Sequence, residues 1–221
     1  MHLPLFPLNT VLFPGMLLPL NIFEPRYREM VNHCVETETP FGVTLIREGQ
    51  EVGGDAVPHE IGSAARIMKT KLLPDGRLHI VAVGTQRFRI EELDHSRVYL
   101  SAEVSLLPFS TEATPETDRL AEMVKRRILE YVELISTASK TEMRLDRVPK
   151  DPKSVAFLVA SALQVDNRER QALLEMAGIS QMLDRERRLL SRELLLMRYM
   201  IDTQPSIMQM GMGPTGYIFP N

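Results

Sequence analysis

The chain has 221 residues, of which 44% are hydrophobic and 25% are charged, so it can bury one large core or two modest ones. Its 26 Lys and Arg residues against 29 Asp and Glu residues give a formal net charge of −3, which excludes a whole-molecule field attracting nucleic acid or an anionic membrane. No stretch reaches the roughly 18 apolar residues of a membrane span. The single cysteine, Cys34, excludes an internal disulfide framework. These totals predict a globular protein in the reducing cytoplasm.

The first 25 residues are apolar but contain five prolines, at positions 4, 7, 14, 19 and 25. Proline lacks a backbone donor and is excluded from helix interiors and central strand positions. We therefore expect bends, strand starts and edge strands of a curled sheet here, and neither a long helix nor a signal peptide. Pro25 instead suits the first turn of a helix.

Residues 3–108 have the pattern of short strands separated by turn signals. Strands are predicted at 41–46, 63–73, 77–84, 86–93 and 98–107. Pro74, Asp75 and Gly76 predict a hairpin connection between two of them. Many short strands with few helices are typical of a small, barrel-like antiparallel sheet.

One helix is expected within this half, starting at Pro25. Apolar residues recur after it at spacings of three and four, which predicts one buried helix face facing the sheet. These residues are Tyr27, Met30, Val31, Cys34 and Val35.

The period changes after the proline-containing stretch 107–117, where apolar content falls. We expect a β-rich subdomain at 1–110, an α-helical bundle at 117–202 and a Met/Gly/Pro-rich tail at 203–221. The helical stripes are Leu120, Val124, Ile128, Tyr131, Val132 and Ile135, then Val155, Leu158, Val159 and Ala162, and finally Leu183, Leu190, Leu194, Met197 and Ile201.

Motifs for catalysis, nucleotide binding or metal binding are missing. The sequence has no GxxxxGK[ST] and no HExxH, and "GMGPTG" at 211–216 has no room for a following helix. Cys34 follows His33, but adjacent helical residues point about 100° apart, so we expect a buried, structural cysteine. The arginines of "RERR" at 185–188 alternate with acid and are predicted to be a solvated helix face. No catalytic residue, metal site or cofactor is predicted.

Several stretches, in order, resemble the amino-terminal domain of Lon proteases. They are "LPLFPLNTVLFPGMLLPLNIFEPRYREMV", "GVTLIREG", "IGSAARIMKTKLLPDGRLHIVAVGTQRFRI", "YLSAEVSLLP" and "ALQVDNRERQALLEMAGISQMLDRERRLLSRELLLM". The resemblance covers residues 1–202. It implies an α+β fold: an N-terminal PUA-like antiparallel β pseudo-barrel with one helix, followed by a C-terminal α-helical bundle.

In Lon proteases this domain precedes ATPase and serine–lysine protease domains, of which this sequence shows no sign. The resemblance thus implies a stand-alone, non-catalytic module that binds protein or peptide. The expected partners are unfolded or exposed apolar polypeptide segments, together with a separate protease or chaperone. One alternative is an accessory subunit that delivers clients to a separate protease. The other is RNA or modified-nucleotide binding through the PUA-like sheet. Charge argues against it, because residues 1–110 hold 10 basic and 13 acidic residues. The oligomeric state stays open.

Two surfaces are candidates for contact with partners. The first, at the start of the first helix, consists of Phe23, Glu24, Arg26, Tyr27, Arg28 and Glu29, which could equally form a solvated helix edge. The second is the apolar part of the tail, expected to pack in a groove of its own chain or of a neighbour. Its residues are Met208, Met210, Met212, Tyr217, Ile218 and Phe219.

Overall fold

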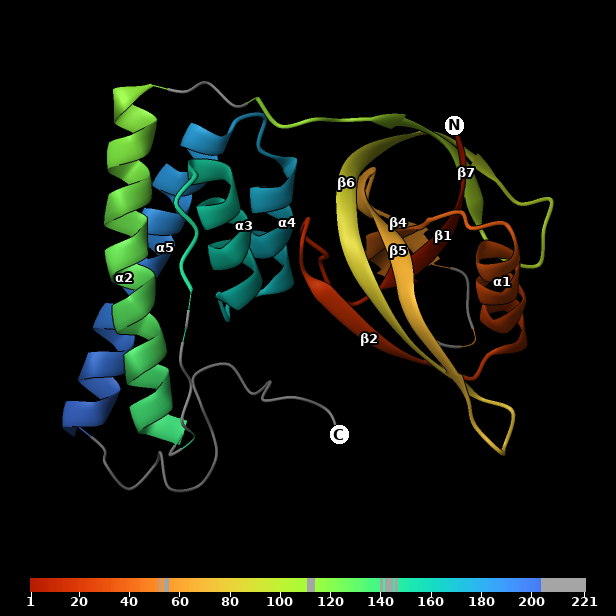
Figure 1. Cartoon of the computed structure of the whole chain (residues 1–221), viewed down its shortest axis with the longest axis horizontal. Coiled ribbons are helices and arrows are strands. Elements are labelled where there is room, and N and C mark those ends of the chain that lie inside the picture. The colour runs from red at the N-terminus through yellow and green to blue at the C-terminus, as the bar shows by residue number, and fades with distance from the viewer. Residues whose placement is uncertain are drawn as a thin grey trace. The chain divides into compact units, whose positions relative to one another are not determined.

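The computed structural model describes residues 1–51, 53, 56–110, 114–139, 141, 145 and 147–203 (Figure 1). The strands are β1 (His2–Leu8), β2 (Leu17–Ile22), β3 (Phe41–Gly49), β4 (Ala56–Pro58), β5 (Ile61–Leu72), β6 (Leu78–Asp94) and β7 (Ser101–Leu106). The helices are α1 (Pro25–Glu36), α2 (Pro115–Ser139), α3 (Pro152–Ala162), α4 (Asn167–Glu175) and α5 (Ile179–Thr203). The predicted α+β class, with a sheet and one helix followed by a helical part, is confirmed. The apolar residues of the tail listed above lie outside the described residues.

Two compact units make up the chain. The first holds Met1–Pro108 together with Arg170–Glu175, and the second holds Phe109–Glu169 with the described residues from Met176 onward. The C-terminal part of α4 therefore belongs to the same unit as the sheet, although more than 60 residues of sequence lie between them. Within the described residues, none of the helices combines the length and the apolar character needed to cross a lipid bilayer.

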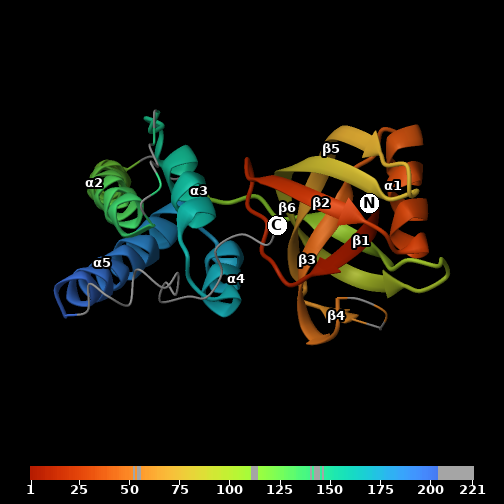
Figure 2. The ribbon, with the colours of Figure 1, turned by 90° about the horizontal axis from the view of Figure 1, so that it is seen from below.

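The sheet of the first unit is curled (Figure 2). Its seven strands follow the order β1-β7-β6-β5-β3-β4, which closes through a β1–β3 pairing, while β2 pairs with β6. All pairs are antiparallel except β1–β3, which is parallel with Leu5 opposite Gly42. The long connection through β2 and α1 allows this arrangement, because parallel strands need a crossover rather than a tight hairpin.

The hairpin predicted at Pro74–Asp75–Gly76 is confirmed. Leu72 is paired with Leu78, the Leu73 amide donates to the Arg77 carbonyl at 2.8 Å, and Gly76 has φ +82°. Glycine is favoured there because L side chains rarely adopt positive φ.

Residues 77–84 and 86–93, predicted as two strands, instead form the single strand β6. Gly84, the last residue of the first predicted strand, allows a close approach of another backbone segment. A Cβ at Gly84 would lie 2.2 Å from the Phe13 carbonyl oxygen. The Gly84 amide donates to the Met16 carbonyl at 3.0 Å, and the Gly15 amide donates to the Gly84 carbonyl at 2.8 Å. The glycine thus admits the β1–β2 connection against an unbroken strand.

Helix α1 buries Tyr27, Met30, Val31 and Cys34 in the core cluster of the first unit, as predicted. Val35, placed on the same face by its spacing, is 46% exposed, so that part of the prediction is wrong. Its position, one residue after Cys34, puts it about 100° around the helix, at the margin of the buried stripe.

A buried arginine holds the C-terminal part of α4 to the sheet of the first unit. The side chain of Arg87, from β6, donates to the carbonyls of Leu107 at 2.9 Å, Pro108 at 3.3 Å and Leu174 at 2.6 Å. Burial lowers its pKa to about 10, so it remains charged at neutral pH. Two further side chains of α4 act similarly: Arg170 donates to the Val11 carbonyl at 3.2 Å, and Gln171 to the Ile61 carbonyl at 3.0 Å.

Replacing Arg87 by Met should lower the free energy of unfolding by about 2–4 kcal/mol, because three carbonyls lose their charged donor. Arg89→Met is the matched control, since Arg89 is an exposed residue of the same strand. Urea denaturation of both variants measures the effect. An equal loss of unfolding free energy in the two variants would contradict the proposed role of Arg87.

The second unit packs its helices through the predicted stripes. Fully buried members include Val124 and Ile128 of α2, Val155 and Val159 of α3, and Leu190 of α5. One acidic residue of α5 interrupts this pattern. Glu186 is 0% exposed, and neither carboxylate oxygen has a hydrogen-bond partner.

Burial raises the pKa of Glu186 well above its usual 4.5. Its neighbours one turn away on α5, at i±3 and i±4, are all buried and apolar. They are Met182, Leu183, Leu189 and Leu190. The folded state therefore holds a proton that the unfolded state releases.

Stability should accordingly be greatest at or below pH 4.5 as far as this group is concerned, and should decline as pH rises toward the raised pKa. Glu186→Gln should remove that decline and raise the midpoint of urea unfolding at pH 8. Glu193→Gln is the control of opposite sign, because Glu193 accepts from Arg192 at 2.8 Å and its loss should destabilise. Parallel pH profiles for the parent and the Glu186 variant would refute the account.

Candidate functional site

A cleft of about 150 Å³ opens in the first unit between β1, β2 and the start of α1. Most of its lining residues have apolar side chains, but the surface exposed in the cleft is about equally polar and apolar, with one amide and two carboxylates among the side chains. The lining residues are Phe6, Leu8, Pro19, Leu20, Asn21, Ile22, Phe23, Glu24, Tyr27 and Glu51. The cleft therefore offers space of side-chain size in which apolar side chains lie beside polar groups.

The wall on the helix side depends on an aromatic stack. Pro25 occupies the first turn of α1, and Tyr27 follows two residues later. The Tyr27 ring stacks on Phe6 of β1 with centroids 4.1 Å apart, and Phe6 in turn lies 6.3 Å from Phe41 of β3. Burial raises the pKa of the Tyr27 phenol, so it stays neutral at physiological pH.

The opposite wall is an edge strand. In the part of the chain that the structure describes, β2 pairs only with β6, and Pro19 lies in its middle opposite Val81. A proline at this position is tolerated because an edge strand has hydrogen-bonding positions without a neighbouring strand. The prediction that the early prolines occupy edge positions is confirmed at Pro19.

The rim of the cleft is acidic. Glu24 accepts from the Arg26 side chain at 3.0 Å, and Glu51 accepts from the Asn9 amide at 2.9 Å. The Arg26 guanidinium lies 4.6 Å above the Tyr27 ring centroid. Two carboxylates thus line the cleft, whereas none of its described lining residues is Lys or Arg, which makes the rim negative.

Three of the six residues predicted at the start of the first helix, Phe23, Glu24 and Tyr27, line this cleft. Arg26 contacts two of them without lining it. Arg28 lies beside Gly76 of the β5–β6 hairpin, and Glu29 is exposed. Whether any of the six binds a partner stays a prediction.

Other residues that line the cleft were not predicted from the sequence, and they come from other parts of the chain. Phe6 and Leu8 lie on β1, Leu20 and Ile22 on β2, and Glu51 follows β3. The apolar opening segment was a signal for the four hydrophobic residues. Nothing local singles out Glu51, because its place in the cleft depends on how the chain folds back after β3.

Among the described residues, no Ser, Thr, Cys, His or Lys lines the cleft, so it does not hold the pairing of a hydroxyl or thiol with a histidine or lysine that activates many nucleophiles. Cys34 is buried, as predicted, and its thiol donates to the Pro40 carbonyl at 3.9 Å. Burial raises the thiol pKa to about 11, which opposes nucleophilic reactivity. Across the described ranges, no three His, Cys, Asp or Glu side chains are grouped so that they could hold a metal ion.

The fold is that of Lon amino-terminal domains. A crystal structure of a Lon N-terminal domain protein from Xanthomonas campestris superposes with a TM-score of 0.63 at 30% identity, covering 83% of this chain and 95% of that one. The N-terminal domain of a Mycobacterium avium complex Lon protease gives a TM-score of 0.68 at 20% identity, covering 86% and 98%. That second likeness concerns the fold alone.

The sequence identifies the family. Residues 2–192 match the model of the ATP-dependent protease La (LON) substrate-binding domain, and the chain belongs to this family. It is 29% identical over 180 residues to a Lon protease of Paraburkholderia phytofirmans, covering 80% of this chain and 22% of that protein. Lon protease 2 of Myxococcus xanthus is 29% identical over 198 residues, covering 85% and 24%. The chain thus spans less than a quarter of the length of these relatives.

Replacing Tyr27 by Leu should lower the free energy of unfolding by about 1–3 kcal/mol, because the stack on Phe6 is lost and a void is left. Tyr27→Phe keeps the ring and should change stability by less than about 0.5 kcal/mol. Urea denaturation of the two variants compares them. An unchanged Leu variant would show that the stack does not hold α1 to the sheet.

Proposed function

We propose that this domain binds exposed apolar segments of unfolded polypeptides, without catalysis of its own, and that the β2–α1 cleft receives one apolar side chain of the segment. The observation that carries the proposal is the cleft itself. A dry, apolar cavity of about 150 Å³ is large enough for benzene, and the volume here is about 150 Å³. A phenylalanine or leucine side chain is therefore the right size.

Phe23 supplies contact area at the mouth. Its side chain is 52% exposed although it lines the cleft, so a bound segment can cover it. Exposed aromatic residues beside a pocket are frequent binding hot spots. The adjacent edge of β2 provides backbone groups along which an extended segment can align.

The acidic rim adds a preference. Glu24 and Glu51 both line the cleft, so a segment with Lys or Arg beside its apolar residue gains electrostatic complementarity. The same rim opposes nucleic acid, whose phosphates would face two carboxylates. Membership of the Lon substrate-binding family supports a polypeptide ligand. Delivery of the bound segment to a separate protease or chaperone is the further part of this proposal.

Titration against a fluorescently labelled, reduced and alkylated protein tests the function, with its folded form as the comparison. We expect selective binding of the unfolded form that changes little with salt. Phe23→Ala should weaken it at least about threefold by removing apolar contact area.

Leu106→Ala is the matched control, because Leu106 is 51% exposed at the end of β7 and does not line the cleft. No binding of the unfolded form, or equal losses in the two variants, would refute the proposed site.

A further inference from the structure

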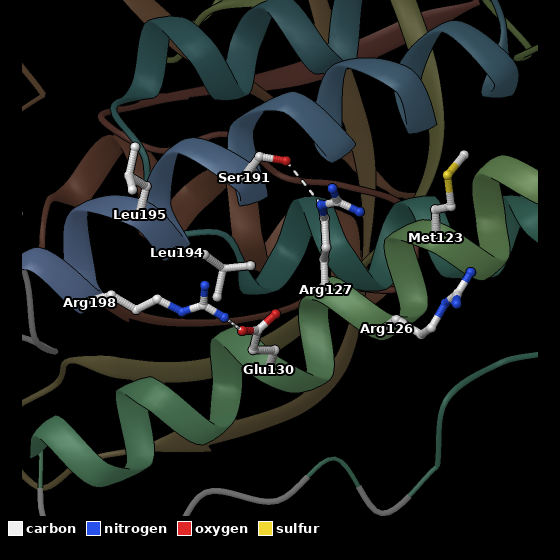
Figure 3. A pocket seen from close by; sticks show the side chains of 8 residues that line it. All are labelled: Met123, Arg126, Arg127, Glu130, Ser191, Leu194, Leu195 and Arg198. Atoms are coloured by element: carbon white, nitrogen blue, oxygen red, sulfur yellow. Dashed lines mark hydrogen bonds and ion pairs between the residues drawn. The ribbon is translucent and has the colours of Figure 1, made fainter.

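A larger cavity, of about 630 Å³, lies within the second unit between α2 and α5 (Figure 3). Each helix contributes residues at i, i+3, i+4 and i+7, so one continuous face of each forms a wall. The walls are Met123, Arg126, Arg127 and Glu130 of α2, and Ser191, Leu194, Leu195 and Arg198 of α5. We refer to this cavity as the α2–α5 groove.

The groove has an apolar floor with an exposed ridge. Leu194 is 5% exposed and forms part of the packed interior, whereas Leu195 is 69% exposed. Met123 adds a third apolar side chain from the facing helix (Figure 3). An exposed leucine beside a hollow is apolar surface that a partner can bury.

The charges of the groove are mainly positive. Arg198 is neutralised by Glu130 across the groove. Arg127 donates to the Ser191 hydroxyl at 3.0 Å, and Arg126 donates to the Glu122 carbonyl of its own helix at 3.4 Å. Among the described residues, no carboxylate lies within 4.0 Å of the Arg126 or Arg127 side chain. The described lining of the groove therefore holds three arginines and one glutamate, which makes it positive overall.

We propose that the α2–α5 groove binds an amphipathic helix of a partner protein, whose apolar face covers Met123 and Leu195 and whose carboxylates pair with Arg126 and Arg127. A groove between two helices with an apolar floor is suited to a third helix presenting residues at i, i+3, i+4 and i+7. The arginines select acidic margins on that helix. Nucleic acid would use the arginines but would leave the leucine and methionine without a matching contact.

This surface belongs to the helical unit and is independent of the β2–α1 cleft, so the two proposals fail separately. The probe is a labelled synthetic peptide of about five helical turns, with Leu at one face and Glu at its margins. A scrambled peptide of equal composition and a peptide with Lys in place of Glu are the comparisons. Fluorescence anisotropy with the full chain gives the dissociation constants.

Arg126→Glu should weaken binding at least about fivefold, and Leu195→Ala at least about threefold. Among the described side chains, Arg126 makes no hydrogen bond to α5, so its replacement should leave the contact between the helices intact. The matched controls are Arg168→Glu, an exposed arginine of α4, and Leu196→Ala, a residue 44% exposed beside Leu195. Neither control lines the groove, and both should bind like the parent.

Equal affinity for the scrambled or Lys-containing peptide would overturn the proposal, as would equal losses in the controls. Tighter, salt-sensitive binding of single-stranded RNA that Leu195→Ala leaves unchanged would assign the groove to nucleic acid instead. A variant that ends at Thr203 provides a further comparison. If it binds the peptide more than about tenfold tighter than the full chain, residues 204–221 occupy the groove, and the proposal of a partner helix is overturned. If the chain self-associates as its concentration rises, and Leu195→Ala abolishes this, the groove binds a second copy of the chain and the proposal of a partner helix is wrong.

Discussion

The stack of Tyr27 on Phe6 is the contact on which the proposed function depends. It joins the first turn of α1 to β1 at 4.1 Å, and Phe6 passes the contact on to Phe41 of β3. Because Pro25 fixes where the helix begins, Tyr27 comes to lie on the core side while Phe23, before the helix, stays half exposed. The cleft exists because the chain must turn from the edge strand β2 into α1 within these few residues.

A second constraint comes from backbone polarity rather than from apolar packing. Where β7 ends and where α4 ends, carbonyl groups would be left without donors. The guanidinium of Arg87 serves Leu107, Pro108 and Leu174 at once. An arginine can do this because its fork presents five donors in fixed directions, which a lysine does not. Gln171 and Arg170 serve other carbonyls of the same unit, which is why residues 170–175 belong with the sheet.

Local features were predictable from the sequence. The hairpin at Pro74–Gly76, the helix starting at Pro25 and the buried face of α1 each depend on residues a few positions apart, and the structure confirms them. The parallel β1–β3 pair and the role of Arg87 depend on contacts between distant segments, which no local pattern encodes. Gly84 illustrates the limit, because the predicted strand ended at this glycine, whereas in the structure the strand continues and the glycine leaves space for the backbone of Phe13.

The candidate site was predictable in part for the same reason. Phe23, Glu24 and Tyr27 stood out as a charged and aromatic cluster at a helix start, and they line the cleft. Glu51 could not be found, because it reaches the cleft only through the path of the chain after β3. The α2–α5 groove can be recognised only once the two helices are known to pack together. In the sequence alone, the residues that each helix contributes to it resemble an ordinary solvent-exposed helix face.

The most direct test of the account is a map of amide chemical-shift changes when the full chain is titrated with a permanently unfolded polypeptide. We expect the largest changes on residues 20–27 and on Glu51, which line or border the cleft. Changes confined to other strands or to the helical unit, with residues 20–27 unaffected, would contradict it.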